Sequence, residues 1–504
     1  MNRRLWVVVL LVMAALPVLG GEIPYRPYEP VEIGAPFTDA DAAGRRPARC
    51  PHGHTVDDPF LDKQYPLCNH GQADDKGQTG SAGCDIGGLE ARLAFKPQQE
   101  IILAIVDSGL ELNHPDVDPA VLWTNPGESG TDAEGRDKAA NGVDDDGNGY
   151  IDDVHGWNFC RNSPDINEDH YHGTHVGGLL CAPANNGTGI AGACPGVKIM
   201  LVKIFGLGSS LGSEQIATAI RYAVDNGARV LSNSYGSPSF TQAMKDAIAY
   251  TAQKGALFVC ASGNSRKNMD LEEEQDYPSC YGVENQLVVG ATNNRDLSTF
   301  CNFGSMVEIA APGENIFSLF PKGQYRSFSG TSQACPLVAG AATMVWMQHP
   351  DWTWRQVKRA VLDSADQVRG LSRYVVGGLR LNLFNALTGR PGRRLPAEDF
   401  SQWREEARTL ESPHPYPNQK TLTFDLAVPG ARKLRVHFAR LAIDHFGDSL
   451  TLRDGGGGLV EYINGIHAAG WSEVIEGDRV QLVLEAGDYI NEFGFVIDAV
   501  QWLP

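Results

Sequence analysis

The stretch IILAIVDSGL, residues 101–110, sets the fold of the central part of this chain. An unbroken apolar run is followed by an aspartate, a serine and a glycine, which is typical of a buried strand that ends in a polar loop. Similar apolar runs recur at 197–204, 229–232, 256–261 and 287–292. Such continuous runs favour a parallel sheet that is covered on both faces.

Helical patterns separate these runs. The stretches 214–226 and 240–254 place apolar residues at helical spacing, Ser213 is a suitable N-cap for the first, and a further helix is expected near 353–366. Strands that alternate with helices predict a doubly wound α/β domain with a parallel sheet. We assign residues 57–390 to this domain.

The pattern changes towards the C-terminus. A basic, proline-containing stretch begins near residue 391, and we interpret 391–418 as a linker. Beyond residue 419, apolar and polar residues alternate in runs such as TLTFDLAV and RVQLVLEA, which are separated by glycine turns. This period of two predicts a small all-β sandwich over 419–504.

Charge and the N-terminal sequence restrict the class of protein. The 504 residues carry a net charge of -19, which argues against nucleic acid and anionic membranes as partners. Residues 1–21, MNRRLWVVVLLVMAALPVLGG, have the pattern of a signal peptide. The alternative is a membrane anchor, but the apolar run is short for a span of roughly 20 residues. We therefore expect a secreted monomer without membrane insertion, in which 22–56 form an N-terminal extension or short propeptide.

The chain has ten cysteines. An even number in an exported chain favours disulfide bonds, although their connectivity cannot be deduced. Cys181, Cys260 and Cys335 lie in apolar stretches and are expected to be buried free thiols. The better candidates for bridges lie in loop-like contexts and are Cys50, Cys68, Cys84, Cys160, Cys194, Cys280 and Cys301.

Three separate motifs each carry one member of a nucleophilic triad: Asp107 in AIVDSGL, His172 in HGTHVGG and Ser332 in SGTSQACPLVAG. A hydroxyl is a poor nucleophile unless a base takes its proton, and the base needs a third group to orient it. Each motif alone has a plainer explanation, such as helix capping. Together, in the order Asp, His, Ser, they resemble the subtilase family of serine endopeptidases.

This resemblance extends over roughly residues 57 to 388 and implies roles for particular side chains. It implies that Asp107 orients His172, that His172 is the general base and that Ser332 is the nucleophile. Asn264, in CASGNS, matches the asparagine of the family's oxyanion hole. His175 matches the second histidine of the family motif, which has a structural role. The alternative is that His172 and His175 together bind a metal ion, but no third ligand lies nearby in the sequence.

The resemblance also implies a substrate-binding segment at Ser234, Tyr235 and Gly236, where backbone pairs with an extended peptide. Asp276 stands at a position that lies at the base of the family's P1 pocket. We hypothesise a preference for Lys or Arg at P1, while the alternative is a solvated charge in an acidic loop. The extension of about 35 residues is shorter than the usual propeptide, so the route of activation stays open.

The loop NGVDDDGNGYIDD, residues 141–153, has alternating oxygen ligands that suit Ca²⁺. The candidate ligands are Asp144, Asp146, Asn148, Tyr150 through its carbonyl group, and Asp152. The twelfth position of an EF-hand loop is normally a glutamate, but here it is His155, so the loop is not a full EF-hand. The alternative is an acidic turn that is simply exposed to solvent.

A second metal site is expected in the C-terminal domain. The stretches DHFGDSLTLRDG and EAGDYINEFGFVIDAV resemble a CUB-like domain, in which acidic residues at one edge bind calcium. This implies Asp444, Asp448 and Asp488 as ligands, with Asn491 as a further candidate.

The leading hypothesis is therefore a secreted, calcium-stabilised serine endopeptidase that acts on polypeptides. A second hypothesis is a catalytically silent secreted protein that binds a partner through its CUB-like domain. A third is acyl transfer to an amine instead of water by the same triad.

Overall fold

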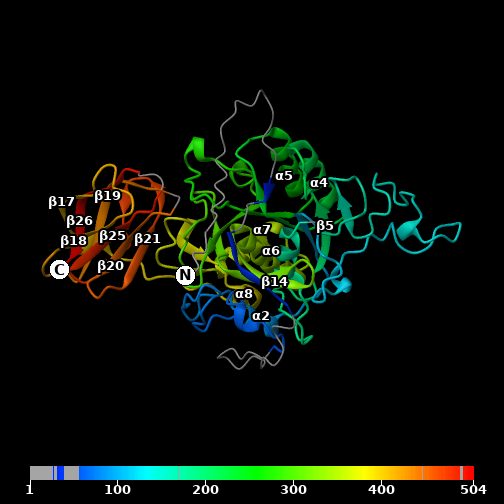
Figure 1. The fold of residues 1–504 in the computed structure, drawn as a ribbon, viewed down its shortest axis with the longest axis horizontal. Helices are drawn as coiled ribbons and strands as arrows, with labels where there is room; N and C mark the ends of the chain where they lie inside the picture. Colours follow the sequence, from blue (N-terminus) through cyan, green and yellow to red (C-terminus); the bar gives the residue numbers. More distant parts are fainter. Residues whose placement is uncertain (1–25, 28–30, 39–55, 169, 445–446, 489–491) are drawn as a thin grey trace, which may run out of the picture.

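The structure is a computed structural model that describes residues 26–27, 31–38, 56–168, 170–444, 447–488 and 492–504. The proposed signal peptide, Cys50 and Asn491 lie outside these ranges. Figure 1 shows two bodies: a large one that carries the helices, and a smaller β-domain at the C-terminal end of the chain.

Within the described residues, nine strands form the main sheet of the large body, and its neighbouring strands are parallel except for the pair β15–β16. In spatial order they are β15 (Asp366–Gln367), β16 (Leu379–Arg380), β12 (Ile309–Pro312), β11 (Gln286–Thr292), β10 (Leu257–Ala261), β8 (Val230–Asn233), β3 (Ile102–Asp107), β5 (Lys198–Lys203) and β4 (Gly156–Asn158). The expected buried strands are confirmed within one or two residues.

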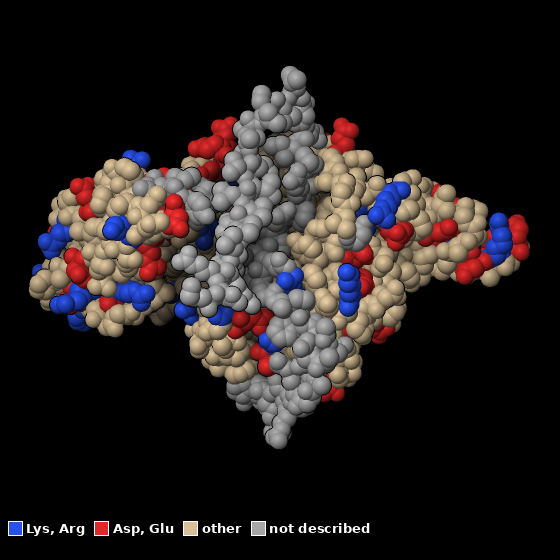
Figure 2. All heavy atoms as spheres, in the orientation of Figure 1, with Lys and Arg blue, Asp and Glu red and all other residues tan. Residues whose placement is uncertain are grey.

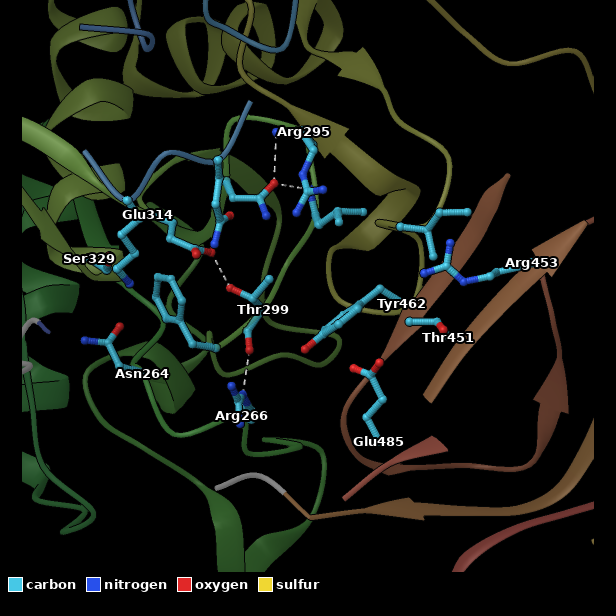
Figure 3. A pocket seen from close by; sticks show the side chains of 16 residues that line it. Asn264, Arg266, Arg295, Thr299, Glu314, Ser329, Thr451, Arg453, Tyr462 and Glu485 are labelled. Carbon is cyan, nitrogen blue, oxygen red and sulfur yellow. Dashed lines mark hydrogen bonds between the residues drawn. The ribbon is translucent and has the colours of Figure 1, made fainter. Parts of the chain in front are cut away.

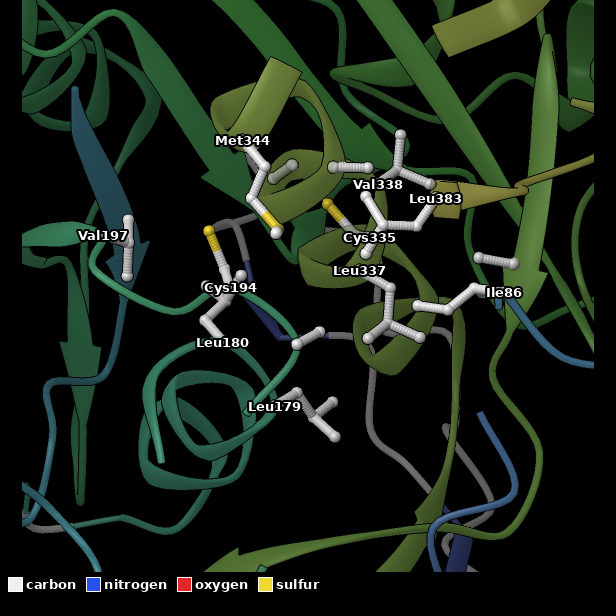
Figure 4. Close-up of a cluster of buried hydrophobic side chains, with 14 of the residues drawn as sticks. Ile86, Leu179, Leu180, Cys194, Val197, Cys335, Leu337, Val338, Met344 and Leu383 are labelled. Atoms are coloured by element: carbon white, nitrogen blue, oxygen red, sulfur yellow. The ribbon is translucent and has the colours of Figure 1, made fainter. Parts of the chain in front are cut away.

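Helices cover both faces of this sheet. They are α2 (Gly88–Ala94), α3 (His172–Cys181), α4 (Ser213–Asp225), α5 (Gln242–Gln253), α6 (Thr331–Gln348), α7 (Trp354–Ser364) and α8 (Leu383–Thr388). Along β3, Leu103 and Ile105 contribute to the core under α3 and α6, whereas Ala104 and Val106 contribute to the core under α4 and α5. This two-sided burial is the reason that the strands are apolar throughout. Apolar side chains of α3 and α6 gather in one cluster on the first of these faces (Figure 4).

One helix boundary differs from the prediction. The N-cap of α4 is Gly212, and Ser213 is its first helical residue. The Gln215 side chain accepts the Gly212 N–H at 3.2 Å, so the helix start is stabilised without a capping hydroxyl.

The β-domain consists of two antiparallel sheets. The first contains β17 (Arg404–Glu411), β26 (Gly494–Leu503), β19 (Lys433–Ile443), β22 (Gly465–His467), β23 (Gly470–Trp471) and β24 (Ile475–Glu476). The second contains β18 (Thr421–Ala427), β25 (Arg479–Glu485), β20 (Ser449–Asp454) and β21 (Leu459–Ile463). Alternate residues of both sheets, such as Phe438 and Leu482, form a single buried core.

The predicted linker over 391–418 is wrong in its second half. Strand β17 lies there and pairs with β26, so the β-domain begins near Arg404. The strand REEARTLE is exposed along almost its whole length, and an edge strand with few buried side chains has no apolar alternation to detect.

The N-terminal segment contributes two strands to the large body. Strand β1 (Arg26–Pro27) pairs antiparallel with β9 (Tyr235–Gly236). Strand β2 (Val31–Thr38) pairs antiparallel with β14 (Gln324–Ser329), which also pairs with β13 (Ile316–Phe320). A further short hairpin joins β6 (Phe205–Gly206) to β7 (Ser209–Ser210).

The cysteines only partly follow the expectation. Cys181, Cys260 and Cys335 are free and buried, as predicted, and Cys68 is disulfide-bonded. The expected bridges are wrong for Cys84, Cys160, Cys194, Cys280 and Cys301, which are not disulfide-bonded. Cys194 and Cys301 are buried in the core, where each sulfur contacts backbone or hydroxyl oxygen.

A search of the described residues finds no helix with the length and apolar character that crossing a membrane requires.

Candidate active site

The functional side chains lie at one edge of the main sheet. Asp107 ends β3, Ser234 follows β8, and Asn264 lies three residues after β10. These strands are parallel neighbours, so their carboxyl ends meet, and ligands of open α/β sheets bind outside such ends.

Asp107 and His172 form a buried pair. The Nδ1 atom of His172, the first residue of α3, lies 2.8 Å from Oδ1 and 3.0 Å from Oδ2 of Asp107. Both side chains are almost completely inaccessible to water. The carboxylate therefore fixes the imidazole ring, and its Nε2 atom is left without a hydrogen bond to any described residue. Such an imidazole is oriented for proton transfer at Nε2.

A second carboxyl group, that of Glu168, lies behind this pair. Its Oε2 atom accepts the Ser108 hydroxyl at 2.9 Å and the Thr174 N–H at 3.0 Å, and its Oε1 atom accepts the His170 N–H at 2.8 Å. Burial, opposed by these hydrogen bonds and assisted by the charge of Asp107, raises the pKa of Glu168 to about 7. Glu168 could not be predicted from the sequence, because a glutamate four positions before a histidine carries no signal of its own.

Ser332 lies in the first turn of α6, which packs against α3. Its hydroxyl donates to the Ser234 carbonyl at 3.3 Å, so it is not hydrogen-bonded to His172 in this conformation. In return, the Ser234 hydroxyl donates to the Ser332 carbonyl at 3.2 Å. That carbonyl would normally accept the N–H of residue 336, which is a proline and has none. Ser234 thus satisfies the oxygen that Pro336 leaves open.

The Asn264 side chain is held in place by the start of α6. Its Oδ1 atom accepts the Thr331 N–H and the Thr331 hydroxyl, both at 2.9 Å, whereas its buried Nδ2 atom has no partner among the described residues. A Cβ atom built on Gly330 would lie 2.7 Å from Gln333 Oε1, 3.3 Å from this Nδ2 and 3.6 Å from the Ser332 nitrogen. The Asn264 amide nitrogen and the Ser332 backbone nitrogen therefore lie close together beside Gly330, next to the Gln333 side chain.

His175 is fully buried, and its Nε2 atom lies 3.0 Å from the Arg326 carbonyl. Burial lowers its pKa to about 3. This neutral, hydrogen-bonded ring has the environment of a structural residue.

The predicted substrate-binding residues surround the same edge. Tyr235 points into the core, where its hydroxyl donates to Asn233 at 2.9 Å, so Tyr235 and Gly236 present only backbone to a ligand. Asp276 is buried and accepts a hydrogen bond from Asn302 Nδ2 at 3.4 Å. Asn302 also accepts the Ser265 N–H at 2.9 Å, so it links Asp276 to the loop that carries Asn264.

The acidic loop protrudes from the large body, at the cyan end of the ribbon in Figure 1, and the outer end of this protrusion carries charges of both signs (Figure 2). Asp146, Glu128 and Asp153 each offer a carboxylate oxygen within 4.8 Å of the others. Burial raises the pKa of Glu128 and of Asp153, whose side chains are inaccessible to water. Three hard oxygen ligands of this kind fit Ca²⁺.

Of the ligands expected from the sequence, only Asp146 belongs to this cluster. The Asp144 carboxylate accepts the N–H groups of Gly147, Asn148 and Gly149, and that of Asp152 accepts the Gly142 N–H. Asn148 contacts the cluster through its amide nitrogen, 3.2 Å from Asp146 and 3.1 Å from Asp153. Tyr150 lies in a cluster of aromatic rings with Trp157, Phe159 and Tyr222. Glu128 precedes the loop, so no spacing rule could find it.

In the β-domain, Asp444 and Asp448 are both buried and are linked through Tyr416. The Tyr416 hydroxyl donates to Asp448 at 2.6 Å and accepts the Asp444 N–H at 2.9 Å. Asp488 is exposed. The Asp448 carboxylate also accepts the Gly487 N–H, at 2.6 Å, so backbone next to Asp488 is tied to this pair.

Comparison with known proteins agrees with this geometry. A family model described as the subtilase family matches residues 98–380. The chain is 32% identical to a thermophilic serine proteinase of Bacillus sp. (strain AK1), over 57% of this chain and 61% of that protein. It is also 32% identical to thermitase of Thermoactinomyces vulgaris, over 56% of this chain and 88% of thermitase. It is 34% identical to subtilisin Savinase of Lederbergia lenta, over 44% of this chain and 80% of that enzyme. The chain therefore belongs to the subtilase family of serine endopeptidases.

Proposed function

We propose that the protein is a secreted endopeptidase that hydrolyses polypeptides through Asp107, His172 and Ser332. Ser332 Oγ attacks the carbonyl carbon of the scissile bond while its proton passes to His172 Nε2. The C–N bond then breaks, and His172 returns the proton to the leaving amine. Water, deprotonated by the same nitrogen, hydrolyses the acyl-enzyme and restores Ser332.

The observation that carries this proposal is the buried Asp107–His172 pair, whose second imidazole nitrogen has no hydrogen-bonding partner among the described residues. The side-chain amide of Asn264 and the Ser332 N–H are the two donors for the oxyanion that forms during attack. In a protein that only binds a partner, an oriented base and a buried amide nitrogen without a hydrogen-bonding partner among the described residues would serve no purpose.

The substrate segment on the acyl side binds as an extended strand along Tyr235–Gly236. The pairing of Arg26–Pro27 with this strand supports the proposal, because it is the contact that an extended peptide would make. The buried carboxylate of Asp276 supports selection of Lys or Arg at P1.

Calcium has a stabilising role in this proposal. Glu128, Asp146 and Asp153 would hold one ion, whose positive charge would offset the repulsion between these three neighbouring carboxylates. We further infer that the β-domain is a CUB-like sandwich, supported by the core that its two sheets share. Export rests on the sequence of residues 1–21.

Labelling with a fluorophosphonate tests the central claim. We expect the wild-type chain to be labelled and to digest casein, and Ser332→Ala to lose both activities by more than about a thousandfold, since the nucleophile supplies the covalent step. Ser401→Ala, at an exposed serine outside the triad and outside the cleft, is the control and should still be labelled. A wild-type chain that is folded but takes no label would contradict the proposal and favour the silent binding protein.

A further inference from the structure

A cavity of about 500 Å³ lies between the large body and the β-domain, next to the active site (Figure 3). From the large body it is lined by Asn264, Arg266, Thr299 and Ser329, among others. Ser329 lies three residues before Ser332, and Asn264 is the proposed oxyanion donor. The cavity therefore lies beside the proposed oxyanion donor.

The position of this cavity corresponds to the leaving-group side of the cleft. Its lining contains neither Ser234–Gly236 nor Asp276, which bind the acyl side in the proposed function. The described parts of the N-terminal segment contact β9 first and the cavity second, in chain order. Arg26–Pro27 pairs with β9, and Val31, four residues after Pro27, pairs with Ser329 at the cavity. A chain that leaves β9 in this direction thus reaches the cavity within a few residues.

The β-domain forms the outer wall of this cavity. Thr451 and Arg453 come from β20, Leu459 and Tyr462 from β21, and Glu485 from the end of β25. In Figure 3, Arg453 and Tyr462 extend from these strands towards Arg295 and Thr299 on the opposite side.

This wall is fixed to the loop that carries Asn264 by shared hydrogen bonds. The Thr299 carbonyl accepts Arg266 Nε at 2.5 Å from one side and Asn464 Nδ2 of the β-domain at 3.1 Å from the other. The Tyr374 hydroxyl also donates to the Tyr462 carbonyl at 3.0 Å. The β-domain residues therefore keep their place relative to Asn264, two positions before Arg266.

The cavity is positively charged, although the chain as a whole has a net charge of -19. Lys76, Arg266, Arg295 and Arg453 line it, against the two carboxylates of Glu314 and Glu485. Within the described part of the chain, Lys76, Arg295 and Arg453 form no ion pair. The Glu314 carboxylate accepts a hydrogen bond from the Thr299 hydroxyl instead of pairing with a cation. Unpaired guanidinium groups that face one cavity favour carboxylate ligands.

We propose that the β-domain completes the subsites for the residues that follow the scissile bond, and that these subsites select acidic side chains. Arg453 of the β-domain and Arg295 of the large body are the specificity-determining residues. This inference rests on the proposed function, because it concerns the leaving group of the same reaction.

The test uses the full-length chain and pairs of peptides that differ only by Glu or Gln at the first, second or third position after the scissile bond. For the wild type we expect kcat/KM to favour Glu over Gln by about tenfold at one of these positions, which corresponds to about 1.4 kcal/mol. Arg453→Gln should reduce this ratio to about threefold or less, and Arg453→Glu should invert it. Raising the ionic strength to about 1 M should also reduce it, because charges are screened beyond about 3 Å.

Arg408→Gln is the matched control, because Arg408 is a β-domain arginine on β17 that does not line the cavity. Its Glu/Gln ratio should equal that of the wild type. Since each ratio compares two substrates of one variant, partial loss of folded protein cancels. If the wild type cleaves neither peptide, the proposed function fails. If it cleaves both and the ratio is the same in Arg453→Gln, Arg453→Glu and the wild type, the role of the β-domain is overturned.

Discussion

Glu168 brings a second carboxyl group to the base of the Asp107–His172 pair, with Ser108 between them. Burial makes a charge on Glu168 costly, and repulsion from the nearby Asp107 carboxylate adds to this cost. The raised pKa of Glu168 expresses this cost, because a protonated Glu168 leaves Asp107 as the single negative charge beside the imidazole.

Replacing Glu168 by Gln should change how stability depends on pH. The pKa of Glu168 is raised from 4.5 to about 7 in the folded chain, so its stabilising effect is complete below pH 4.5 and is lost as the pH rises through 7. Relative to the wild type, Glu168→Gln should therefore be more stable at pH 8 than at pH 5, by roughly 1–3 kcal/mol. Urea unfolding at the two pH values measures this difference, and Glu111→Gln on the same face is the control. Equal differences at both values would show that Glu168 ionises normally.

The members of the triad could be predicted from the sequence because each stands in a distinctive local motif. The partners of these residues could not. Glu168 and the exchange of hydrogen bonds between Ser234 and Ser332 depend on contacts between segments that the sheet topology brings together, and no spacing in the sequence reports them.

In the acidic protrusion, too, the sequence predicts the element but not the contacts of its side chains. Alternating oxygens predict a metal-binding loop, but the loop turns the Asp144 carboxylate back onto its own N–H groups. The buried carboxylates come instead from Glu128, which precedes the loop, and from Asp153, its last residue. The main sheet was predictable because two-sided burial leaves a continuous apolar signal, whereas the exposed edge strand β17 leaves none.

Calcium titration distinguishes the two sets of ligands. In the wild type we expect Ca²⁺ to raise Tm and EDTA to reverse the effect, with about 2.7 kcal/mol of stabilisation at a hundred times Kd. Glu128→Gln should abolish the Ca²⁺-dependent increase, while Asp144→Asn should keep most of it. If Asp144→Asn loses the response and Glu128→Gln keeps it, the ligand set expected from the sequence is the correct one.

At the scale of the whole molecule, the contact between the two bodies is polar and largely buried. Arg373 and Glu461 form an ion pair at 2.5 Å, and His467 stacks on Phe303 with ring centroids 4.4 Å apart. Both domains could be outlined from apolar periodicity. Their arrangement could not, because these polar contacts have no period and join residues that are distant in the chain.

Acid should loosen this contact. Burial, reinforced by the charge of Arg373, lowers the pKa of His467 from 6.5 to about 3. A histidine whose pKa is lowered stabilises the docked state above pH 6.5, and this stabilisation is lost as the pH falls towards 3. Hydrogen exchange, corrected for intrinsic rates, should therefore increase in residues 461–467 between pH 7 and pH 4. Strand β25, in the core of the β-domain, is the internal reference; equal increases in both segments would contradict a specific effect at the contact.

The division of the cleft between two bodies separates chemistry from selection. The outer wall stands on the hairpin β20–β21, and no member of the triad belongs to that hairpin. Replacing these two strands can therefore change the specificity for the substrate residues that follow the cleaved bond, without any change in the residues that cleave it.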